Sequence, residues 1–434
     1  MEVKPGYKQT EVGVIPEEWV VSLLADVITS FQNGFAFASH GYVKSGIPIV
    51  TMAQIGLDGR FNFTSESVNY WPTEAASALR AFQLFRGDII IAMTDVTPQK
   101  NLIGRMAEVT EIGPLLLNQR VGLFRLDAKK IDPYFLRAMS NSSRWRGYAR
   151  AVASLGVQAN IGTNDIRAGK LPLPPLSEQR VIATALSDVD ELLGGLDRLI
   201  AKKRDLKQAA MQQLLTGQTR LPGFHAVWDV KRLGDLFNFS GGYSASRDEL
   251  STEGHCYLHY GDIHGSTKTC IDTDADFPNI PKLDIPLKRV SPASMLNDGD
   301  VVFVDASEDD AGTSKHVVVV NKSKKPFISG LHTIVAKSKT DELAHEFRRY
   351  CFQTPAIRQQ FLFYCVGTKV SGISKSNIPK LTLSFPSLPE QTAIASVLTE
   401  MDGELAVLTQ RREKTCALKQ AMMQELLTGK TRLI

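Results

Sequence analysis

Residues 176–221 read LSEQRVIATALSDVDELLGGLDRLIAKKRDLKQAAMQQLLTGQTRL, and a similar sequence occurs a second time in the chain. Residues 388–433 read LPEQTAIASVLTEMDGELAVLTQRREKTCALKQAMMQELLTGKTRL and align with residues 176–221, without a gap, at a constant offset of 212 residues (388 less 176). A repeat of this length predicts two copies of a whole domain rather than a solenoid of short units. We expect the repeated stretches to be a shared framework and the unlike sequence between them to carry the information.

Each repeated stretch is expected to be one helix of about 40 residues, which would be about 60 Å long. Its apolar residues recur at alternating spacings of three and four, which is the pattern of a coiled-coil seam. The expected seam residues are Leu186, Val189, Leu193, Leu196, Ile200, Leu206 and Leu214 in the first helix and Leu398, Met401, Leu405, Leu408, Leu418, Met422 and Leu426 in the second. Two such helices in one chain are expected to pack together in an antiparallel pair. The alternative is two separate amphipathic helices, each packed on its own domain.

Local signals mark both ends of these helices. Ser177, and Ser387 together with Glu390, have the residue types and the spacing of N-terminal caps. Gly217 and Gly429 follow the last pair of leucines and are typical of C-terminal stops.

The sequence before each helix contains short apolar runs separated by Gly, Pro, Asn and Asp, and this pattern predicts strands. The predicted strands are residues 47–55, 87–94 and 120–126 in the first copy and 256–263, 299–306, 315–320 and 332–337 in the second, with predicted helices at residues 131–151 and 342–362. Trp19 aligns with Trp228 at an offset of 209 residues (228 less 19), so the duplication reaches the start of each copy.

These features together predict an α+β fold in which two mixed α/β domains are separated by two long helices that form an antiparallel coiled coil, with a pseudo-twofold internal duplication. The predicted segments are a first domain at residues 1–172, a first helix at 173–221, a second domain at 222–384 and a second helix at 385–434.

The composition is that of a globular protein. The 434 residues are 43% hydrophobic and 22% charged, with a formal net charge of +4 that permits nucleic-acid binding without demanding it. No run approaches the roughly 18 apolar residues of a membrane span, and the first residues lack the apolar core of a signal peptide, so we expect a cytoplasmic protein. The five cysteines form no CxxC pair and are expected to be reduced.

No motif in the sequence predicts catalysis. Residues 132–135 read DPYF, which lacks the second proline of the DPPY motif of amino-methyltransferases, and Asp132 is expected to cap a helix instead. Residues 429–431 read GKT, but the earlier glycine of a phosphate-binding loop is missing. The eight histidines show no metal-ligand spacing, so we expect no metal and no cofactor of the chain's own.

At this point the residues resemble a family, the specificity subunits of type I restriction–modification systems. The resemblance lies in PLPPLSEQ and LPEQ, which lead into long helices ending in LLTGQTRL and LLTGKTRL, and in the opening GVIPEEW with its degenerate echo near Trp228. It covers essentially the whole chain, in the order variable domain, shared helix, variable domain, shared helix.

The resemblance implies both a fold and a role. The two unlike domains would be target-recognition domains, each reading one half of a bipartite, asymmetric site in double-stranded DNA. The helices would set the spacing and dock two methyltransferase (modification) subunits, and restriction/translocase subunits would join the complex. Those partners would bind S-adenosylmethionine, ATP and Mg, methylate adenine at N6 and cut DNA, and this chain would be a non-catalytic subunit.

Base reading needs side chains that reach base edges, commonly Arg, Lys, Asn and Gln. Candidate DNA-binding residues are Thr97, Gln99, Lys100, Asn101, Arg105, Asn118, Gln119 and Arg120 in the first domain and Tyr243, Ser244, Arg247, Ser314, Lys315 and His316 in the second. The alternative for each is a solvated loop or the polar end of a strand. Arg144, Arg146 and Arg150 either contact phosphates or cover one face of a helix.

Two other functions compete with this interpretation. One is a coiled-coil scaffold whose end domains bind proteins and have no DNA role. The other is a self-contained DNA-modifying enzyme with duplicated recognition domains, although the expected catalytic motifs are missing.

Overall fold

The computed structural model describes residues 4–154, 158–266, 268–307, 315–365 and 371–433. It divides into two compact units, the first formed by residues 1–197 and 410–434 and the second by residues 198–409. Each unit therefore contains one of the two unlike domains together with part of each long helix. The unit limits fall inside the helices, so the domain boundaries predicted from the sequence stay predictions.

The first unit is built on two four-stranded sheets. One has the order β10-β8-β12-β4 and the other the order β6-β5-β11-β7. The strands are β4 (Ile28–Asn33), β5 (Ile47–Val50), β6 (Asn69–Trp71), β7 (Gln83–Leu84), β8 (Ile89–Ala92), β10 (Met106–Glu108), β11 (Leu115–Leu117) and β12 (Val121–Leu126). Three two-stranded ribbons accompany them, namely β1 (Tyr7–Thr10) with β2 (Gly13–Pro16), β3 (Val20–Leu23) with β14 (Lys170–Leu173), and β9 (Thr94–Asp95) with β13 (Ala159–Asn160).

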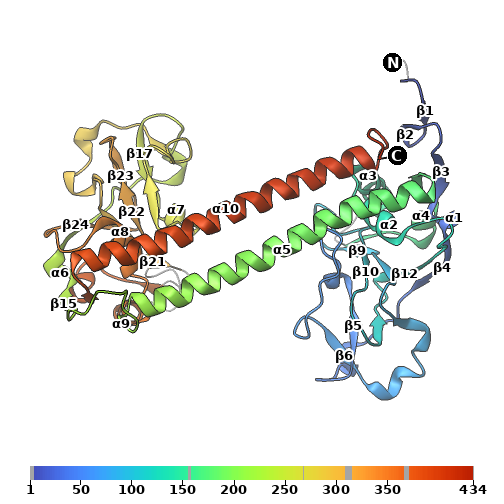
Figure 1. Cartoon of the computed structure of the whole chain (residues 1–434), viewed down its shortest axis with the longest axis horizontal. Helices are drawn as coiled ribbons and strands as arrows, with labels where there is room; N and C mark the ends of the chain where they lie inside the picture. The colour runs from blue at the N-terminus through green and yellow to red at the C-terminus, as the bar shows by residue number, and fades with distance from the viewer. Residues whose placement is uncertain (1–3, 155–157, 267, 308–314, 366–370, 434) are drawn as a thin grey trace. The chain divides into compact units, whose positions relative to one another are not determined.

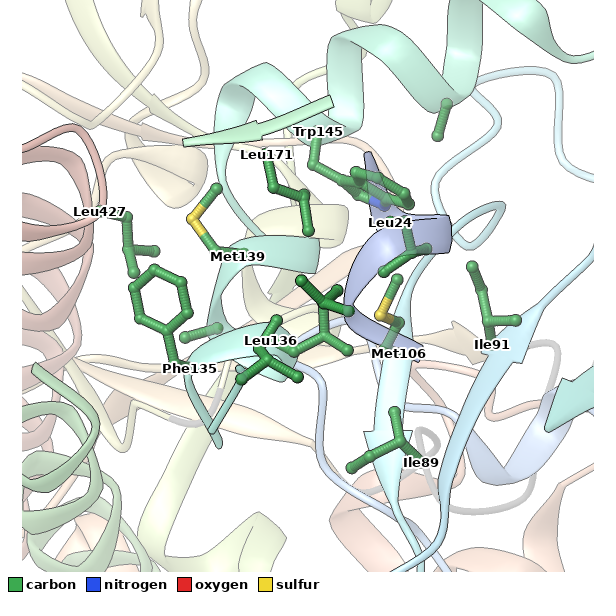
Figure 2. Close-up of a cluster of buried hydrophobic side chains, with 14 of the residues drawn as sticks. Leu24, Ile89, Ile91, Met106, Phe135, Leu136, Met139, Trp145, Leu171 and Leu427 are labelled. Carbon is green, nitrogen blue, oxygen red and sulfur yellow. The ribbon is translucent and has the colours of Figure 1, made fainter. Parts of the chain in front are cut away.

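The sequence of strand β8 is a continuous apolar run rather than an alternating one, because both faces of the strand are buried. Ile89 and Ile91 belong to the core beneath helices α2 (Pro133–Ser140) and α3 (Ser143–Val152) (Figure 2). Ile90 and Ala92 belong to a second core shared with β5, β7, β11 and β12. A strand buried on both faces has no solvent side on which polar residues are favoured.

The second unit repeats this plan with a five-stranded sheet, in the order β16-β24-β20-β22-β18, and a three-stranded sheet, in the order β19-β17-β23. The strands are β16 (Phe237–Gly241), β17 (His255–Leu258), β18 (Cys270–Asp272), β19 (Lys282–Leu283), β20 (Val301–Val304), β22 (His316–Val320), β23 (Phe327–Ser329) and β24 (Thr333–Ser338). The ribbons are β15 (Asp229–Arg232) with β26 (Thr382–Phe385) and β21 (Ala306–Ser307) with β25 (Ser371–Gly372). Most predicted strands are confirmed, but two are shorter than predicted. The one at 47–55 ends at Val50, where a 3-10 helix (Met52–Gln54) follows, and the one at 256–263 ends at Leu258, where α7 (Tyr260–His264) follows.

The single helices predicted at 131–151 and 342–362 are each two helices. The first pair is α2 (Pro133–Ser140) and α3 (Ser143–Val152), and the second is α8 (His345–Cys351) and α9 (Pro355–Tyr364). The break is made by N-caps, because the Ser142 hydroxyl accepts from the Trp145 backbone at 3.3 Å and the Thr354 hydroxyl from the Ile357 backbone at 3.3 Å.

The two predicted long helices are confirmed as α5 (Leu176–Leu214) and α10 (Leu388–Leu426), of 39 residues each (Figure 1). Gly217 and Gly429 have φ values of 71° and 70°, as expected for C-terminal stops. The predicted N-terminal cap at Ser177 is wrong, because Ser177 lies inside the first turn of α5. Ser387 does directly precede α10, and its carbonyl accepts from the Gln391 backbone at 2.9 Å, but the Glu390 carboxylate of the expected capping box bonds to Arg220 instead.

The same two positions of the repeat contact each other in both units, with α5 and α10 in opposite roles, so the two helices are antiparallel within each unit. In the first unit Lys419 donates to Asp190 at 2.7 Å, and in the second Lys207 donates to Asp402 at 2.5 Å. Both members of one pair are offset by 212 residues from the members of the other. The expectation of an antiparallel pair is confirmed within each unit.

The ends of the repeats are joined in the same reciprocal way. Arg432 donates to both carboxylate oxygens of Glu178, at 2.9 and 2.8 Å, and Arg220 donates to both of Glu390, at 2.5 Å each. The EQ and TRL motifs of the sequence are therefore partners, each EQ meeting the TRL of the other repeat. Bidentate pairs of this kind are strong and fix geometry.

Two residues predicted for the seam are wrong. Leu206 and Leu418 are 48% and 55% exposed, while most other predicted seam residues are buried or half-buried. Counting by sevens from Leu186 places Lys207 in the seam, and counting from Leu398 places Lys419 there. These lysines reach the aspartates of the facing helix, so the neighbouring leucines point away from it.

Within the described ranges, no helix is both apolar enough and long enough to span a membrane.

Candidate nucleic-acid interface

The first unit brings its two groups of predicted reading residues to one end of the β10-β8-β12-β4 sheet. The 96–105 loop joins β9 to β10, and residues 118–120 join β11 to β12. The backbone of Met93, which leads into the loop, donates to the carbonyl of Arg120 at 3.0 Å. Residues far apart in the sequence therefore share one end of the sheet.

Asp95 holds the start of the 96–105 loop. Its carboxylate is 2% exposed and accepts from the backbone and the hydroxyl of Thr97 at 2.7 and 2.8 Å. It also accepts from the backbone of Leu102 at 2.5 Å and of Ile103 at 3.3 Å. Burial acts to raise the pKa of Asp95, but these hydrogen bonds outweigh it and hold the pKa below its usual value. The Thr97 hydroxyl thus serves the shape of the loop.

Helix α3 holds the same loop from its other side. The buried guanidinium of Arg146 donates to the carbonyl of Lys100 at 2.8 Å, to that of Asn101 at 2.9 Å and to that of Ile103. The indole of Trp145 donates to the carbonyl of Gly104 at 2.7 Å. Arg146 is buried and bonds to backbone of its own chain, so it fits neither of the two alternatives, a phosphate contact or an exposed helix face.

Positive charge gathers around the loop. Arg105 donates to the Asn101 carbonyl at 2.7 Å and to the Asn141 side chain, and Arg150 donates to the Asn101 side chain at 3.1 Å. Burial, and then the neighbouring charge of Arg150, lowers the pKa of Arg105. Lys100 reaches the carbonyls at the end of α3 at 3.4 Å. Three cations around one loop form a surface suited to a polyanion.

The predicted residues of the first domain differ in accessibility. Gln99, Gln119 and Arg120 are exposed, and Lys100 is half-buried. Asn118 is buried, and its side chain accepts from the Arg120 backbone at 3.2 Å, so its prediction as a base-reading residue is wrong. The sequence could not distinguish it from its neighbours, because all three lie in one polar run.

The corresponding end of the second unit carries a different set of groups. Exposed Arg247 lies 3.0 Å from the Asp262 carboxylate and 3.3 Å from the ring of His259, and Ser244 is exposed nearby in the chain. Tyr243 packs with its ring half-buried and gives its carbonyl to the Tyr257 hydroxyl at 2.9 Å. The two ends therefore present unlike side chains on similar strands.

The other predicted group of the second domain is partly wrong. The Lys315 ammonium bonds to the carbonyl of His264, close to the start of β22. His316 is 6% exposed, and its ring packs on Phe303 and Phe352, 5.5 and 5.2 Å between centroids, so it belongs to the core. Ser314 lies outside the described residues.

A glycine brings two backbones together at each of these ends. A Cβ on Gly34 would lie 2.2 Å from the carbonyl oxygen of Asn118, and one on Gly242 would lie 1.8 Å from that of Gly330. Both positions follow the edge strand of their sheet, so the same close approach supports both candidate interfaces.

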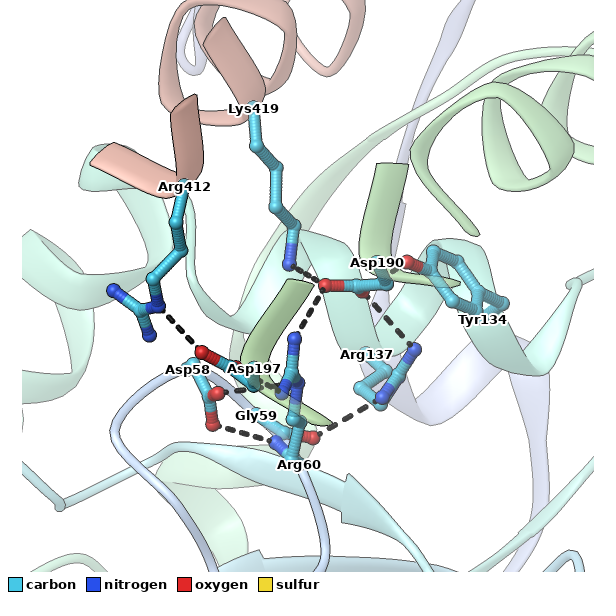
Figure 3. A network of polar contacts seen from close by, with 9 residues as sticks. All are labelled: Asp58, Gly59, Arg60, Tyr134, Arg137, Asp190, Asp197, Arg412 and Lys419. Carbon is cyan, nitrogen blue, oxygen red and sulfur yellow. Dashed lines mark hydrogen bonds and ion pairs between the residues drawn. The ribbon is translucent and has the colours of Figure 1, made fainter. Parts of the chain in front are cut away.

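The α/β domain of the first unit is fixed to the helix pair by an ionic network (Figure 3). Asp190 of α5 accepts from the Tyr134 hydroxyl at 2.5 Å and lies 3.7 Å from Arg60 and 3.8 Å from Arg137. Lys419 completes the shell from α10. Burial acts to raise the pKa of Asp190, but the hydrogen bonds from Lys419 and Tyr134 and the charges of Lys419 and Arg137 lower it overall. These contacts join the α/β domain of this unit to both of its long-helix segments.

The residues considered as parts of catalytic motifs in the sequence have structural roles in the described part of the chain. The Asp132 carboxylate caps α2 by accepting from the Phe135 backbone at 3.0 Å, as predicted. Gly429 is the C-terminal stop of α10. No group of three or more His, Cys, Asp or Glu side chains that could hold a metal occurs among the residues described.

Sequence reasoning missed one polar residue at the first interface. Asn160 on β13 is exposed, and its amide oxygen accepts from the Thr94 hydroxyl at 3.1 Å and from Gln158 at 3.3 Å. Strand β13 is two residues long and pairs with a strand 66 positions earlier, so no local pattern marked it.

Comparisons with known proteins agree on one family. A family model described as "Type I restriction modification DNA specificity domain" matches residues 16–201 and 226–415. The MjaX specificity subunit of a type I restriction enzyme of Methanocaldococcus jannaschii is 25% identical over 442 residues, covering 98% of this chain and 97% of that protein. The EcoKI specificity subunit of Escherichia coli is 22% identical over 409 residues, covering 88% of this chain and 82% of that one.

A solved structure has the same fold. The S subunit of a type I restriction–modification system from M. genitalium matches with a TM-score of 0.57 at 14% identity, covering 98% of each chain.

Proposed function

The chain belongs to the type I restriction modification DNA specificity family, and we propose that it is the non-catalytic subunit that reads the DNA target for its complex. The proposal rests on the contrast between the two long helices, which are equivalent, and the two sheet ends, which carry different side chains. The reciprocal pairs of the helices are equivalent at an offset of 212 residues, whereas the polar side chains at the two sheet ends differ.

Two unlike readers on equivalent supports favour a target in two unlike halves. The end of the first unit with the 96–105 loop would read one half of a double-stranded site, and the end with Tyr243, Ser244 and Arg247 would read the other. The α5 and α10 helices would set the distance between the halves. Exposed Arg120 and half-buried Lys100 are our candidates for contacts to phosphate, and Gln99 and Gln119 are candidates for contacts to bases.

The same duplication is the basis for the protein partners that we propose. Equivalent supports would dock two copies of one methyltransferase subunit, and restriction/translocase subunits would join them. Leu206 and Leu418 support this, because they are equivalent positions that are both exposed, one in each unit. S-adenosylmethionine, ATP and Mg would be bound by those partners. The scaffold function without a DNA role is not supported, because the matching family is described by DNA specificity.

The test is a binding selection from random duplex DNA, with the full chain in complex with its methyltransferase partner. The proposal predicts a split site, two unlike defined halves separated by a spacer of fixed length and no sequence preference. A single continuous site, or enrichment of no sequence, would contradict it.

The salt dependence of binding gives an independent readout. Arg120→Ala should lower the slope of log affinity against log salt by about 0.9, the value for one lost phosphate contact. Arg358→Ala is the control, because Arg358 is exposed on α9 of the other unit and makes no side-chain hydrogen bond within the described chain. Affinity that does not depend on salt would favour a protein ligand instead.

A further inference from the structure

Arg146 is a buried cation whose hydrogen bonds all go to one loop. The guanidinium is 5% exposed and donates to three carbonyls of the 96–105 loop, those of Lys100, Asn101 and Ile103. Burial, and then the charges of Arg105 and Arg150, lowers the pKa of Arg146 to about 10, so the group stays protonated at neutral pH. A buried charge is costly unless hydrogen bonds compensate it, so these three bonds are the reason it can remain there.

The loop that it holds has little freedom elsewhere. Gly104 has a φ of +73°, and a Cβ there would lie 2.6 Å from the Cβ of Ala149, so the loop lies directly on α3. Lys100 has a φ of 50°, a conformation that residues with side chains rarely adopt. Asp95 accepts hydrogen bonds from amides of the loop, and Arg146 donates hydrogen bonds to its carbonyls. The two side chains therefore hold both kinds of backbone group in the loop.

Among the described residues, the second copy has no equivalent of these anchors. At the offset of 212 residues, Ser307 stands in place of Asp95 and Ile357 in place of Trp145. Arg358 is the equivalent of Arg146, but it is exposed and makes no side-chain hydrogen bond among the described residues. The anchoring is therefore a property of the first domain and not of the shared framework.

We infer that Arg146 is a positioning residue for base reading by the first domain: it holds the 96–105 loop in the one shape in which exposed Gln99 and its neighbours can meet base edges. This inference rests on the proposed function. Hydrogen bonds to bases discriminate only when donor and acceptor are placed within a narrow geometry. A loop released from Arg146 keeps its charges and therefore its attraction to phosphate, but it loses its fixed shape and with it the preference among bases.

The experiment compares the complexes of the full chain and its methyltransferase partner that carry the wild-type sequence, Arg146→Met, Arg146→Lys or Arg358→Met. Each is put through the same selection from random duplex DNA, and affinity for the selected site is measured at several salt concentrations. Arg146→Met should reduce the base preference in one half of the site by about tenfold, near the low end of what a mismatched base pair costs. The other half and the salt slope should not change.

The two remaining variants separate positioning from folding. Arg146→Lys keeps the charge but cannot reach three carbonyls at once, so it should show the same loss in the same half, to a smaller degree. Arg358→Met should leave both halves as they are. A thermal unfolding midpoint is measured for each complex, so that a variant that has lost its fold is recognised. If Arg146→Met does not fold, Arg146→Lys decides the question.

Three results would overturn the inference: unchanged preference in both halves with Arg146→Met and Arg146→Lys, an equal loss in both halves, or a lower salt slope, which would make Arg146 a phosphate contact. If the wild-type complex selects no split site, the proposed function fails. If it selects one and the Arg146 variants read it unchanged, only the present inference fails.

Discussion

Gly242 is required by the backbone that lies opposite it. Any side chain there would bring a Cβ to 1.8 Å from the carbonyl oxygen of Gly330, and neither backbone can move without disturbing the end of the sheet. Gly242→Ala should therefore lower the free energy of unfolding by about 1–3 kcal/mol, as overpacking does. The adjacent Gly241→Ala is a matched control, because its Cβ would have no heavy atom within 4 Å. Equal unfolding midpoints for the two variants would refute the steric argument.

Asp190 should make the stability of the first unit sensitive to acid. Its pKa is lowered in the folded chain by Lys419, Tyr134 and Arg137 despite burial, so the unfolded chain binds the proton more readily. The stabilisation is fully present above the ordinary aspartate pKa, near pH 4, and is lost as the pH falls through the lower folded value. The difference in unfolding midpoint between the wild type and Asp190→Asn should thus be largest near neutral pH and shrink on acidification.

Asp188→Asn controls for the charge change, because Asp188 is exposed two residues away on the same helix. A constant difference between the wild type and Asp190→Asn at every pH would show that the carboxylate is not stabilised in its charged form.

Individual residues also show that burial and backbone hydrogen bonding could not be predicted from residue type alone. The polar runs near Gln99 and Gln119 were found from residue type alone, and the structure brings both to one sheet end. Asn118 and His316 share that residue type but are buried, because burial depends on which strand lies beside them. The anchors Asp95 and Arg146 were not recognised as such, since their partners are backbone groups that no sequence pattern identifies.

At the scale of elements, the long helices were the most predictable part of the chain. Their length, stops and antiparallel pairing follow from a repeat that is visible without a structure. The seam was predicted one residue off at Leu206 and Leu418, because a search for apolar residues passes over lysines that occupy seam positions and pair with aspartates. The break at 131–151 was missed because Ser142 caps α3 with no proline or glycine beside it. The break at 342–362 did carry a local signal, because Pro355 follows Thr354 and proline favours the first turn of a helix.

The exposed leucines give a prediction about assembly. If each unit docks one methyltransferase subunit through its exposed helix face, Leu206→Ser and Leu418→Ser should each weaken the binding of one copy, and the double variant should weaken both. Mass measurement of the intact complex over a dilution series reads this directly. Val227→Ser is the control, because Val227 is 93% exposed but lies outside the helices. Full occupancy of the double variant at every dilution would place the docking surface elsewhere.

At the scale of the whole molecule, the duplicated helices should act as a spacer. Four residues inserted after Asp197 and four after Thr409, equivalent positions at the unit limits, add about one turn to each helix. One turn is about 5.4 Å, and a base pair occupies about 3.4 Å, so the preferred spacer should lengthen by one or two base pairs. Both half-sites should keep their sequences. A change in either half-site, with the spacer unchanged, would contradict the spacer role.

The proposed function requires two unlike reading domains on equivalent supports, and the decisive experiment replaces one reading domain with the other. Residues 24–169 can replace residues 233–381, because α1 (Leu24–Val27) and α6 (Leu233–Leu236) begin these segments and the equivalent strands β14 and β26 follow them. The complex with this variant chain should select an inverted repeat of the first half-site, since twofold symmetry in a protein is mirrored in its site. Selection of the original asymmetric site by the folded variant would contradict it.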